Sequence, residues 1–241
     1  MPELIEGHID GQKIQTPTGT TVLEAARAQG LDIPTLCHHE GLPPEGNCRV
    51  CLVEINGRLA ASCMYPLREN GFTVLTGSPS VHAARRFVLE MLVNSVPASP
   101  RLLALAAEYG AAPEPRFLNS DPVDLCIRCG RCTRACEING YSAISLVGRG
   151  RERQVTGPFH QPPEDCVGCR ACAEVCPTGA ITYTEKDDRR FIWGREFELA
   201  RCESCGRALA TMEELRGSGR ENVCDACRRR ELAKGLKTAF G

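Results

Sequence analysis

Sixteen cysteines constrain this 241-residue chain more than any other feature of its sequence. Most of them stand in Cys-x-x-Cys pairs, which direct two sulfurs at one central ion, whereas a disulfide needs partners that face each other. Residues 1–10 (MPELIEGHID) lack the basic and then apolar segments of a secretory leader. No stretch approaches the ~18 consecutive apolar residues that a membrane helix needs. The sequence therefore predicts a cytoplasmic metalloprotein with reduced thiols and no direct membrane insertion.

The cysteines fall into four quartets, with none left over. The second and third quartets share the spacing C-x2-C-x2-C-x3-C, so they form an internal repeat. The first quartet is Cys37, Cys48, Cys51 and Cys63, the second is Cys126, Cys129, Cys132 and Cys136, the third is Cys166, Cys169, Cys172 and Cys176, and the fourth is Cys202, Cys205, Cys224 and Cys227.

The repeated spacing of the second and third quartets is typical of two-cluster ferredoxins, in which the fourth cysteine of each run ligates the other cluster. Three cysteines on a tight loop hold one face of a cubane, and the fourth, on the helix that follows, reaches across. We expect one [4Fe–4S] cluster on Cys126, Cys129, Cys132 and Cys176, and the other on Cys166, Cys169, Cys172 and Cys136. A pair of zinc sites is the alternative, but zinc usually joins two Cys-x-x-Cys units rather than three cysteines in a row.

The first quartet has one Cys-x-x-Cys pair and a distant cysteine on each side, which is the order of ligands in a plant-type [2Fe–2S] centre. Its first loop, between Cys37 and Cys48, is longer than the plant-type loop. His38 and His39 follow the first cysteine, so a Rieske-type centre is an alternative. Because these histidines are adjacent and four cysteines are already present, we expect them to lie around the site without ligating iron.

The fourth quartet has the spacing of a zinc ribbon, with two Cys-x-x-Cys knuckles. A mononuclear iron site and a further [4Fe–4S] cluster are the alternatives. A helix is expected to start near Asp225. Its basic residues form either a docking element or a solvated face. They are Arg228, Arg229, Arg230, Lys234 and Lys237.

Turn and capping signals predict the secondary structure outside the cysteine motifs. Hairpins are expected at Asp10-Gly11 and Asn56-Gly57. Residues 22–29 favour a helix capped by Thr20 or Thr21. The order of strand pair, helix, cysteine loop, strand pair and final strand is that of a β-grasp ferredoxin. Further helices are expected over 81–94, capped by Ser80, and over 101–109.

These observations predict an α+β protein in four parts. Residues 1–78 form a β-grasp [2Fe–2S] domain, and residues 79–121 form a helical linker. Residues 122–194 form a ferredoxin domain with two [4Fe–4S] clusters. Residues 195–241 form a small zinc-ribbon module with a basic helical tail.

Four stretches resemble the N-terminal part of the large iron–sulfur subunit of respiratory complex I. They are equally similar to the diaphorase iron–sulfur subunit of NAD-linked hydrogenases and to the N-terminal region of iron-only hydrogenases. The stretches are IPTLCHHEGLPPEGNCRVCLVEI, ASCMYPLRENGFTV, CIRCGRCTRACEINGYSAISLVGRGRERQVTGPF and CVGCRACAEVCPTGAI. The resemblance covers about residues 1–185 and implies a flavin- and NAD(P)-binding partner subunit.

One departure from the family concerns a further [4Fe–4S] site, which family members usually hold with one histidine and three cysteines just after the β-grasp domain. The corresponding stretch, MLVNSVPASPRLLALAAEYG, contains neither residue type. His82 lies upstream, and we interpret it as an ordinary exposed residue. We therefore expect this cluster to be absent, which leaves open how the [2Fe–2S] centre connects to the ferredoxin pair.

Composition and motifs favour an electron-relay subunit without catalytic residues of its own. With 29 basic and 30 acidic residues and 5 % aromatics, a nucleic-acid surface is not expected. No Rossmann glycine motif or flavin motif is present. One-electron centres in series predict a relay between a flavin/NAD(P)-binding subunit and a catalytic subunit such as a hydrogenase or formate dehydrogenase. A metal-stapled scaffold and an oxidoreductase with its own undetected active site are the alternatives.

The assignment of every cysteine to a quartet predicts the metal content. Protein purified anaerobically should contain about ten irons and one zinc per chain, because one [2Fe–2S] and two [4Fe–4S] clusters accompany one zinc ion. Metal analysis measures both. About fourteen irons without zinc would show instead that the fourth quartet holds another cluster.

Overall fold

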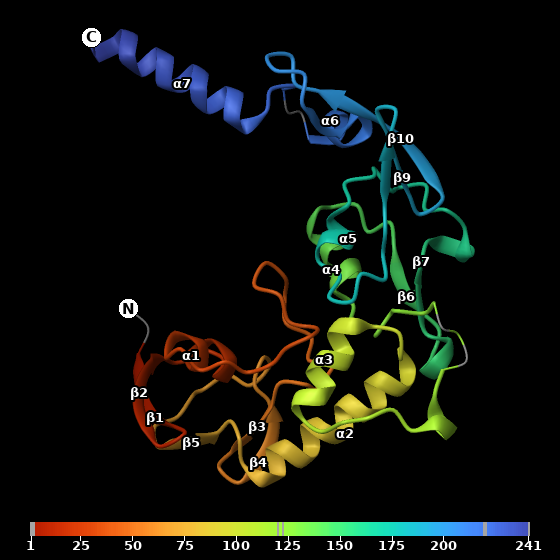
Figure 1. The fold of residues 1–241 in the computed structure, drawn as a ribbon. Coiled ribbons are helices and arrows are strands. Elements are labelled where there is room, and N and C mark those ends of the chain that lie inside the picture. Colours follow the sequence, from red (N-terminus) through yellow and green to blue (C-terminus); the bar gives the residue numbers. More distant parts are fainter. Residues whose placement is uncertain (1–2, 120, 122, 219–220, 241) are drawn as a thin grey trace. The chain divides into compact units, whose positions relative to one another are not determined.

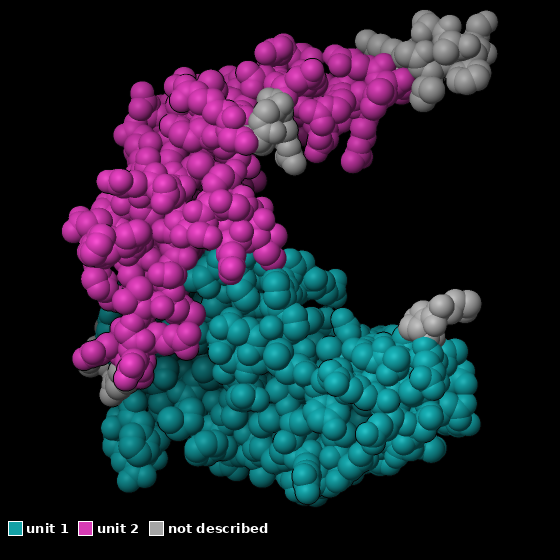
Figure 2. Space-filling view, turned by 180° about the vertical axis from the view of Figure 1, so that it is seen from behind, with its two compact units in different colours: residues 1–134, 175–180 teal, residues 135–174, 181–241 magenta. Residues whose placement is uncertain are grey.

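The computed structural model describes residues 3–119, 121, 123–218 and 221–240 (Figure 1). The chain forms two compact units (Figure 2). The first contains residues 1–134 and 175–180, and the second contains residues 135–174 and 181–241. None of the helices in the described part is long and apolar enough to cross a membrane.

The first unit contains a mixed five-stranded sheet in the order β2-β1-β5-β3-β4. Strands β1 and β5 are parallel, and the other neighbours are antiparallel. The expected hairpins are confirmed, since the two turn residues of each adopt positive φ, as a type I′ turn requires. The strands are β1 (Leu4–Ile9), β2 (Gln12–Pro17), β3 (Leu52–Ile55), β4 (Arg58–Ala61) and β5 (Phe72–Leu75).

Helix α1 (Val22–Ala28) begins where the sequence predicts, at a capping box. The Thr21 side chain accepts a hydrogen bond from the Glu24 backbone, and the Glu24 carboxylate accepts one from the Thr21 backbone at 2.9 Å. The buried residues of α1, Val22 and Leu23 among them, pack into one core with Ile9, Val53 and Val74 of the sheet. This core fixes the start of the long loop that carries Cys37 and Cys48.

Helices α2 (Pro79–Ser95) and α3 (Pro100–Glu108) pack against each other in the first unit (Figure 1). Ser78, rather than the predicted Ser80, caps α2 by accepting a hydrogen bond from the Val81 backbone. Pro79 explains the difference, because proline favours the first turn of a helix and carries no N–H to satisfy. A 3-10 turn, η1 (Pro115–Phe117), follows.

Helix α4 (Arg131–Ile138) begins in the first unit and ends in the second. The second unit contains the hairpin β6 (Ser145–Val147) and β7 (Gln154–Thr156), and a four-stranded sheet in the order β11-β10-β9-β8. The strands of this sheet are β8 (Thr184–Lys186), β9 (Arg189–Ile192), β10 (Arg195–Arg201) and β11 (Ala208–Thr211). The remaining elements are η2 (Gly150–Glu152), η3 (Pro158–His160), α5 (Ala171–Glu174), α6 (Met212–Ser218) and α7 (Asp225–Phe240).

The four-stranded sheet crosses the position where we expect the zinc-ribbon module to begin. Strand β10 starts at Arg195 and pairs with β9, with Arg195 opposite Ile192. The division at residues 78, 121 and 194 stays a prediction. Helix α7 begins at Asp225 as expected, while the side chains of Lys234 and Lys237 lie outside the described residues.

Arg85 tests how α2 is held to the sheet. It is 3 % exposed, donates two hydrogen bonds to the Leu52 carbonyl of β3 at 3.0 and 2.7 Å, and donates one to the Tyr109 hydroxyl at 3.1 Å. Replacement by alanine leaves buried acceptors without donors, so Arg85→Ala should lower the free energy of unfolding by about 2 kcal/mol. Urea denaturation measures this change.

The matched control is Arg86→Ala on the next residue of α2. Arg86 is exposed and pairs with Glu90 one turn later. Its removal should change the free energy of unfolding by about 0.5 kcal/mol or less. Equal effects of the two substitutions would contradict the tethering role of Arg85.

Candidate metal centres

The four cysteines of the first quartet are all buried in the first unit and lie in two close pairs. The Cys37 and Cys48 backbones each donate to the sulfur of the other residue at 3.4 Å. The sulfurs of Cys51 and Cys63 are 3.4 Å apart. Two pairs of thiolates fit a two-iron centre, in which each iron takes two cysteines.

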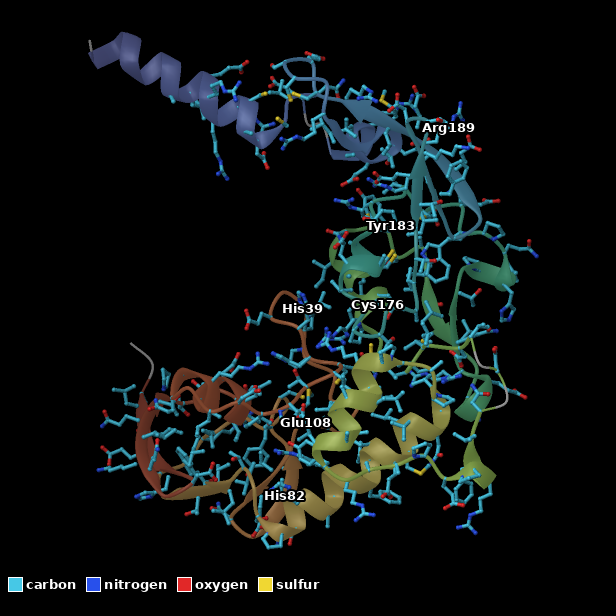
Figure 3. The ribbon with its side chains drawn as sticks, in the orientation of Figure 1. His39, His82, Glu108, Cys176, Tyr183 and Arg189 are labelled. Atoms are coloured by element: carbon cyan, nitrogen blue, oxygen red, sulfur yellow. The ribbon has the colours of Figure 1, made fainter. Side chains whose placement is uncertain are left out.

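His38 and His39 follow Cys37 in the loop between α1 and β3, and Figure 3 labels His39 there. The His39 Nδ1 atom accepts a hydrogen bond from the Gly41 backbone at 3.1 Å. Burial, together with the positive charges of Arg27 and Arg131, lowers the pKa of His38. The His38 Nδ1 atom is buried without a hydrogen-bond partner among the described residues. That neither histidine ligates iron stays a prediction.

The two ferredoxin loops have the same backbone conformation. In the first loop Arg128 and Gly130 have φ of 56° and 71°, and in the second loop Gly168 and Arg170 have φ of 70° and 62°. These pairs occupy equivalent positions relative to Cys126 and Cys166. Left-handed residues at two alternate positions turn the chain tightly, so that three cysteines can face one centre.

Cys126, Cys129, Cys132 and Cys176 all belong to the first unit. Burial raises the pKa of Cys129 to about 11, and the nearby Cys176 adds to this rise. Because a bound cluster needs thiolates, loading of this site must displace protons. Cys176 follows α5 instead of lying on a helix, which corrects our expectation. Pro177 explains the difference, since the residue before a proline avoids the helical conformation.

Cys136, Cys166, Cys169 and Cys172 all belong to the second unit and line one cavity. Cys136 lies on α4, as expected. Its sulfur accepts a hydrogen bond from the Ala143 backbone at 3.2 Å, and the Cys166 sulfur accepts one from Gly168 at 3.4 Å. Burial raises the pKa of Cys172 to about 11, and a hydrogen bond from Trp193 opposes this rise.

The four-stranded sheet holds the second ferredoxin loop in place. Arg190, 3 % exposed, donates to the Gly168 carbonyl at 2.6 Å. The fully buried Thr211 of β11 donates to the Val167 carbonyl. A Cβ atom on Gly168 would lie 2.6 Å from the Phe197 ring, so only glycine permits this packing. Sequence reasoning missed these contacts, because no local pattern connects the loop with strands that follow it much later in the chain.

Two arginines of α4 reach the first quartet, and both are 8 % exposed. Arg134 donates to the carbonyls of Cys37 at 2.8 Å and Cys129 at 3.3 Å through one nitrogen, Nη2. Its Nη1 donates to Pro43, and its Nε forms an ion pair with Glu45 at 3.0 Å.

Arg131 makes a second connection within the first unit. Its Nη2 donates to the His38 carbonyl, and its Nη1 donates to the Val175 carbonyl at 3.4 Å. Its buried Nε has no partner among the described residues. A donor of this kind beside two cysteine quartets fits sites that hold acceptors such as thiolate and sulfide.

The stretch 91–110, which lacks the family's extra ligands, forms part of an apolar core. Its contributions are Val93, Val96, Leu102 and Ala106. The same core includes Cys37, Cys48 and Cys129, which are ligands expected for two different centres. Hydrocarbon side chains thus occupy this part of the first unit, and the ligands of the two centres pack into one core. His82 is exposed, as expected.

The fourth quartet brings all four of its sulfurs close together. The ligand atoms of Cys202, Cys205, Cys224 and Cys227 all lie within 4.8 Å of one another, and among the described residues no other group of three or more potential ligands is this close. The Cys205 and Cys224 sulfurs are 3.7 Å apart. The Cys224 backbone donates to the Cys202 sulfur at 3.3 Å and lowers the pKa of Cys202 to about 6.

Three domain descriptions match the chain. The 2Fe-2S iron-sulfur cluster binding domain matches residues 3–78. Two descriptions of a 4Fe-4S dicluster domain match residues 122–183 and residues 165–211. The chain therefore contains a [2Fe–2S] domain and a dicluster [4Fe–4S] domain separated by a helical region. The second dicluster match extends past the third quartet to include Cys202 and Cys205.

A solved structure decides the family. The crystal structure of an NAD+-reducing [NiFe]-hydrogenase in the H2-reduced state contains a chain with 32 % identity and a TM-score of 0.63, and the match covers 73 % of our chain and 85 % of that chain. The protein belongs to the complex I and NAD-linked hydrogenase family of iron–sulfur subunits.

Sequence similarity to two longer proteins supports the same family assignment. The iron–sulfur subunit is 34 % identical to a subunit of the NADH-quinone oxidoreductase of Rhizobium meliloti over 84 % of its length. It is also 34 % identical to the HndD polypeptide of the NADP-reducing hydrogenase of Solidesulfovibrio fructosivorans over 77 % of its length. It spans only 27 % and 36 % of these two relatives.

The distribution of the ferredoxin cysteines between the two units predicts crossed ligation. Cys176→Ala should impair the cluster on Cys126, Cys129 and Cys132, although Cys176 belongs to the other sequence motif. Electron paramagnetic resonance of the reduced variant, which resolves the two [4Fe–4S] signals, measures this loss.

The matched control is Cys136→Ala, which should impair the cluster on Cys166, Cys169 and Cys172 instead. The two variants should therefore lose opposite signals. The crossed assignment would be overturned if each variant lost the signal of the cluster on its own sequence motif instead.

Proposed function

We propose that this chain is an electron-relay subunit of a cytoplasmic multi-subunit oxidoreductase. It connects a flavin/NAD(P)-binding subunit with a catalytic subunit such as a hydrogenase or formate dehydrogenase. The observation that carries the proposal is the shared core of Cys37, Cys48 and Cys129, because it brings ligands of two redox centres together. The names of the matched hydrogenase and NADH oxidoreductase subunits support the same proposal.

The proposed iron–sulfur ligand sets use twelve of the sixteen cysteines. When bound, each iron–sulfur cluster takes up and releases a single electron. The [2Fe–2S] centre takes Cys37, Cys48, Cys51 and Cys63. The first [4Fe–4S] cluster takes Cys126, Cys129, Cys132 and Cys176, and the second takes Cys166, Cys169, Cys172 and Cys136. Such reduced thiols favour a cytoplasmic location.

The residues around the clusters position and shield them. Arg131 and Arg134 tie the loop of the first quartet to the first ferredoxin loop through backbone carbonyls. Arg190 and Thr211 hold the second ferredoxin loop through its own carbonyls. These side chains leave the thiolates free to bind metal, and their contacts keep the loops from opening to water.

For the fourth quartet we propose a single zinc ion. A tetrahedral site with Zn–S bonds of about 2.3 Å has sulfurs about 3.8 Å apart, which agrees with the 3.7 Å between the Cys205 and Cys224 sulfurs. A cubane would separate its cysteine sulfurs further, because four irons lie between them. The dicluster match that reaches residue 211 favours the competing cluster assignment. Zinc is redox-silent, so the proposed ion would stabilise the module without carrying electrons.

Two other functions compete with the relay. A metal-stapled scaffold would need the cysteines only for stability, and an oxidoreductase in its own right would need a site for hydride or substrate. The cubane spacing of two quartets argues against the scaffold. The missing nucleotide and flavin motifs argue against an independent NAD(P)-linked enzyme.

A reductive titration tests the relay. The loaded chain should take up about three electrons from a low-potential donor, one for each cluster. NADH or NADPH alone should not reduce it, because a hydride donor needs a flavin before one-electron centres. Addition of a flavin-containing NAD(P)H-oxidising subunit should restore reduction. Direct reduction of the isolated chain by NADH or NADPH would contradict the proposal.

A further inference from the structure

The hairpin between β9 and β10 contains a tryptophan at a position that suits it poorly. Ile192 pairs with Arg195, so Trp193 and Gly194 form a two-residue turn. Their φ angles are 55° and 70°, which is the type I′ geometry that asparagine followed by glycine adopts best. A bulky side chain in the left-handed region is strained, and such strain persists only where the surroundings hold the residue.

The surroundings of Trp193 are those of the second ferredoxin site. Its indole Nε1 donates a hydrogen bond to the Cys172 sulfur at 3.4 Å. The half-buried ring lines the same cavity as the four cysteines of that site. Cys172 itself is shielded from water, since it is only 8 % exposed. The strained turn thus directs an N–H group at a cysteine sulfur inside a cavity.

This arrangement has no counterpart at the other clusters, because the chain contains a single tryptophan. Ile192, the neighbour of Trp193, is 3 % exposed and lines the same cavity without any polar side-chain atom. The hairpin therefore supplies both an apolar wall and one directed donor.

We propose that Trp193 is a positioning residue that raises the reduction potential of the second [4Fe–4S] cluster through its hydrogen bond to Cys172. This inference rests on the ligand set proposed above. The reduced cluster carries one more negative charge than the oxidised cluster, so a donor to a cysteine sulfur stabilises the reduced form more. The bond makes the second unit a more favourable place for the electron.

The competing explanation is that Trp193 only covers the cavity. The two explanations predict opposite shifts in the reduction potential of the second cluster when Trp193 is replaced. Loss of the hydrogen bond should lower the potential. Admission of water should raise it, because water stabilises the more highly charged reduced form.

The experiment uses the loaded full chain and exploits its single tryptophan. Biosynthetic replacement of tryptophan by benzothienylalanine changes only residue 193 and exchanges the indole N–H for sulfur in a ring of nearly the same shape. Trp193→Phe is the second variant. Potentiometric titration followed by electron paramagnetic resonance gives the midpoint potential of each cluster, and iron analysis checks loading.

Both replacements should lower the reduced-to-oxidised ratio of the second cluster by up to about tenfold at a fixed ambient potential, which is about 59 mV for one electron. The first cluster should keep its potential. Phe191→Leu is the matched control on strand β9, at an exposed residue that does not line the cavity, and it should leave the potential of the second cluster unchanged.

An unchanged or higher potential of the second cluster in the analogue-labelled protein overturns the inference. So does an equal shift of both clusters. Failure of the proposed ligand set is distinguished from these outcomes, because Cys136→Ala would then leave the signal of the second cluster in place.

Discussion

The buried guanidinium of Arg134 joins two cysteine loops that are 97 and 5 residues away from it in the sequence. One nitrogen donates to the carbonyls of Cys37 and Cys129, and Glu45 balances the charge at 3.0 Å. Burial of an arginine costs free energy that hydrogen bonds must offset, so Arg134 needs both loops in place to satisfy its donors. The packing of the first quartet against the first ferredoxin loop depends on it, and Arg131 strengthens the same connection.

An apolar core orders the stretch 91–110 together with three of the cysteines. Leu89 and Val93 of α2 and Leu102 and Ala106 of α3 form a core with Cys37, Cys48 and Cys129. Burial of such side chains contributes roughly 1.5–3 kcal/mol each for the larger ones. Apolar packing therefore positions these cysteines within the first unit.

Local signals predicted much of this structure. The Asp10-Gly11 and Asn56-Gly57 turns, the capping box at Thr21 and the cysteine spacing each act over a few residues, so the sequence reveals them directly. The start of α2 was misplaced by two residues because two serines compete and Pro79 decides between them. The contacts of Arg134, Arg190 and Thr211 could not be predicted, since they join residues that only tertiary packing brings together. An arginine between two cysteines looks the same in sequence whether it is solvated or buried.

From the shared core of Cys37, Cys48 and Cys129 we infer that the [2Fe–2S] centre and the first [4Fe–4S] cluster lie next to each other in the first unit. The most direct test is the spin relaxation of the reduced [2Fe–2S] centre, measured by electron paramagnetic resonance power saturation at increasing degrees of reduction. The account predicts that its relaxation becomes faster and its lines broaden when the first [4Fe–4S] cluster also becomes paramagnetic. A [2Fe–2S] signal that saturates identically in both redox states of that cluster would contradict the account.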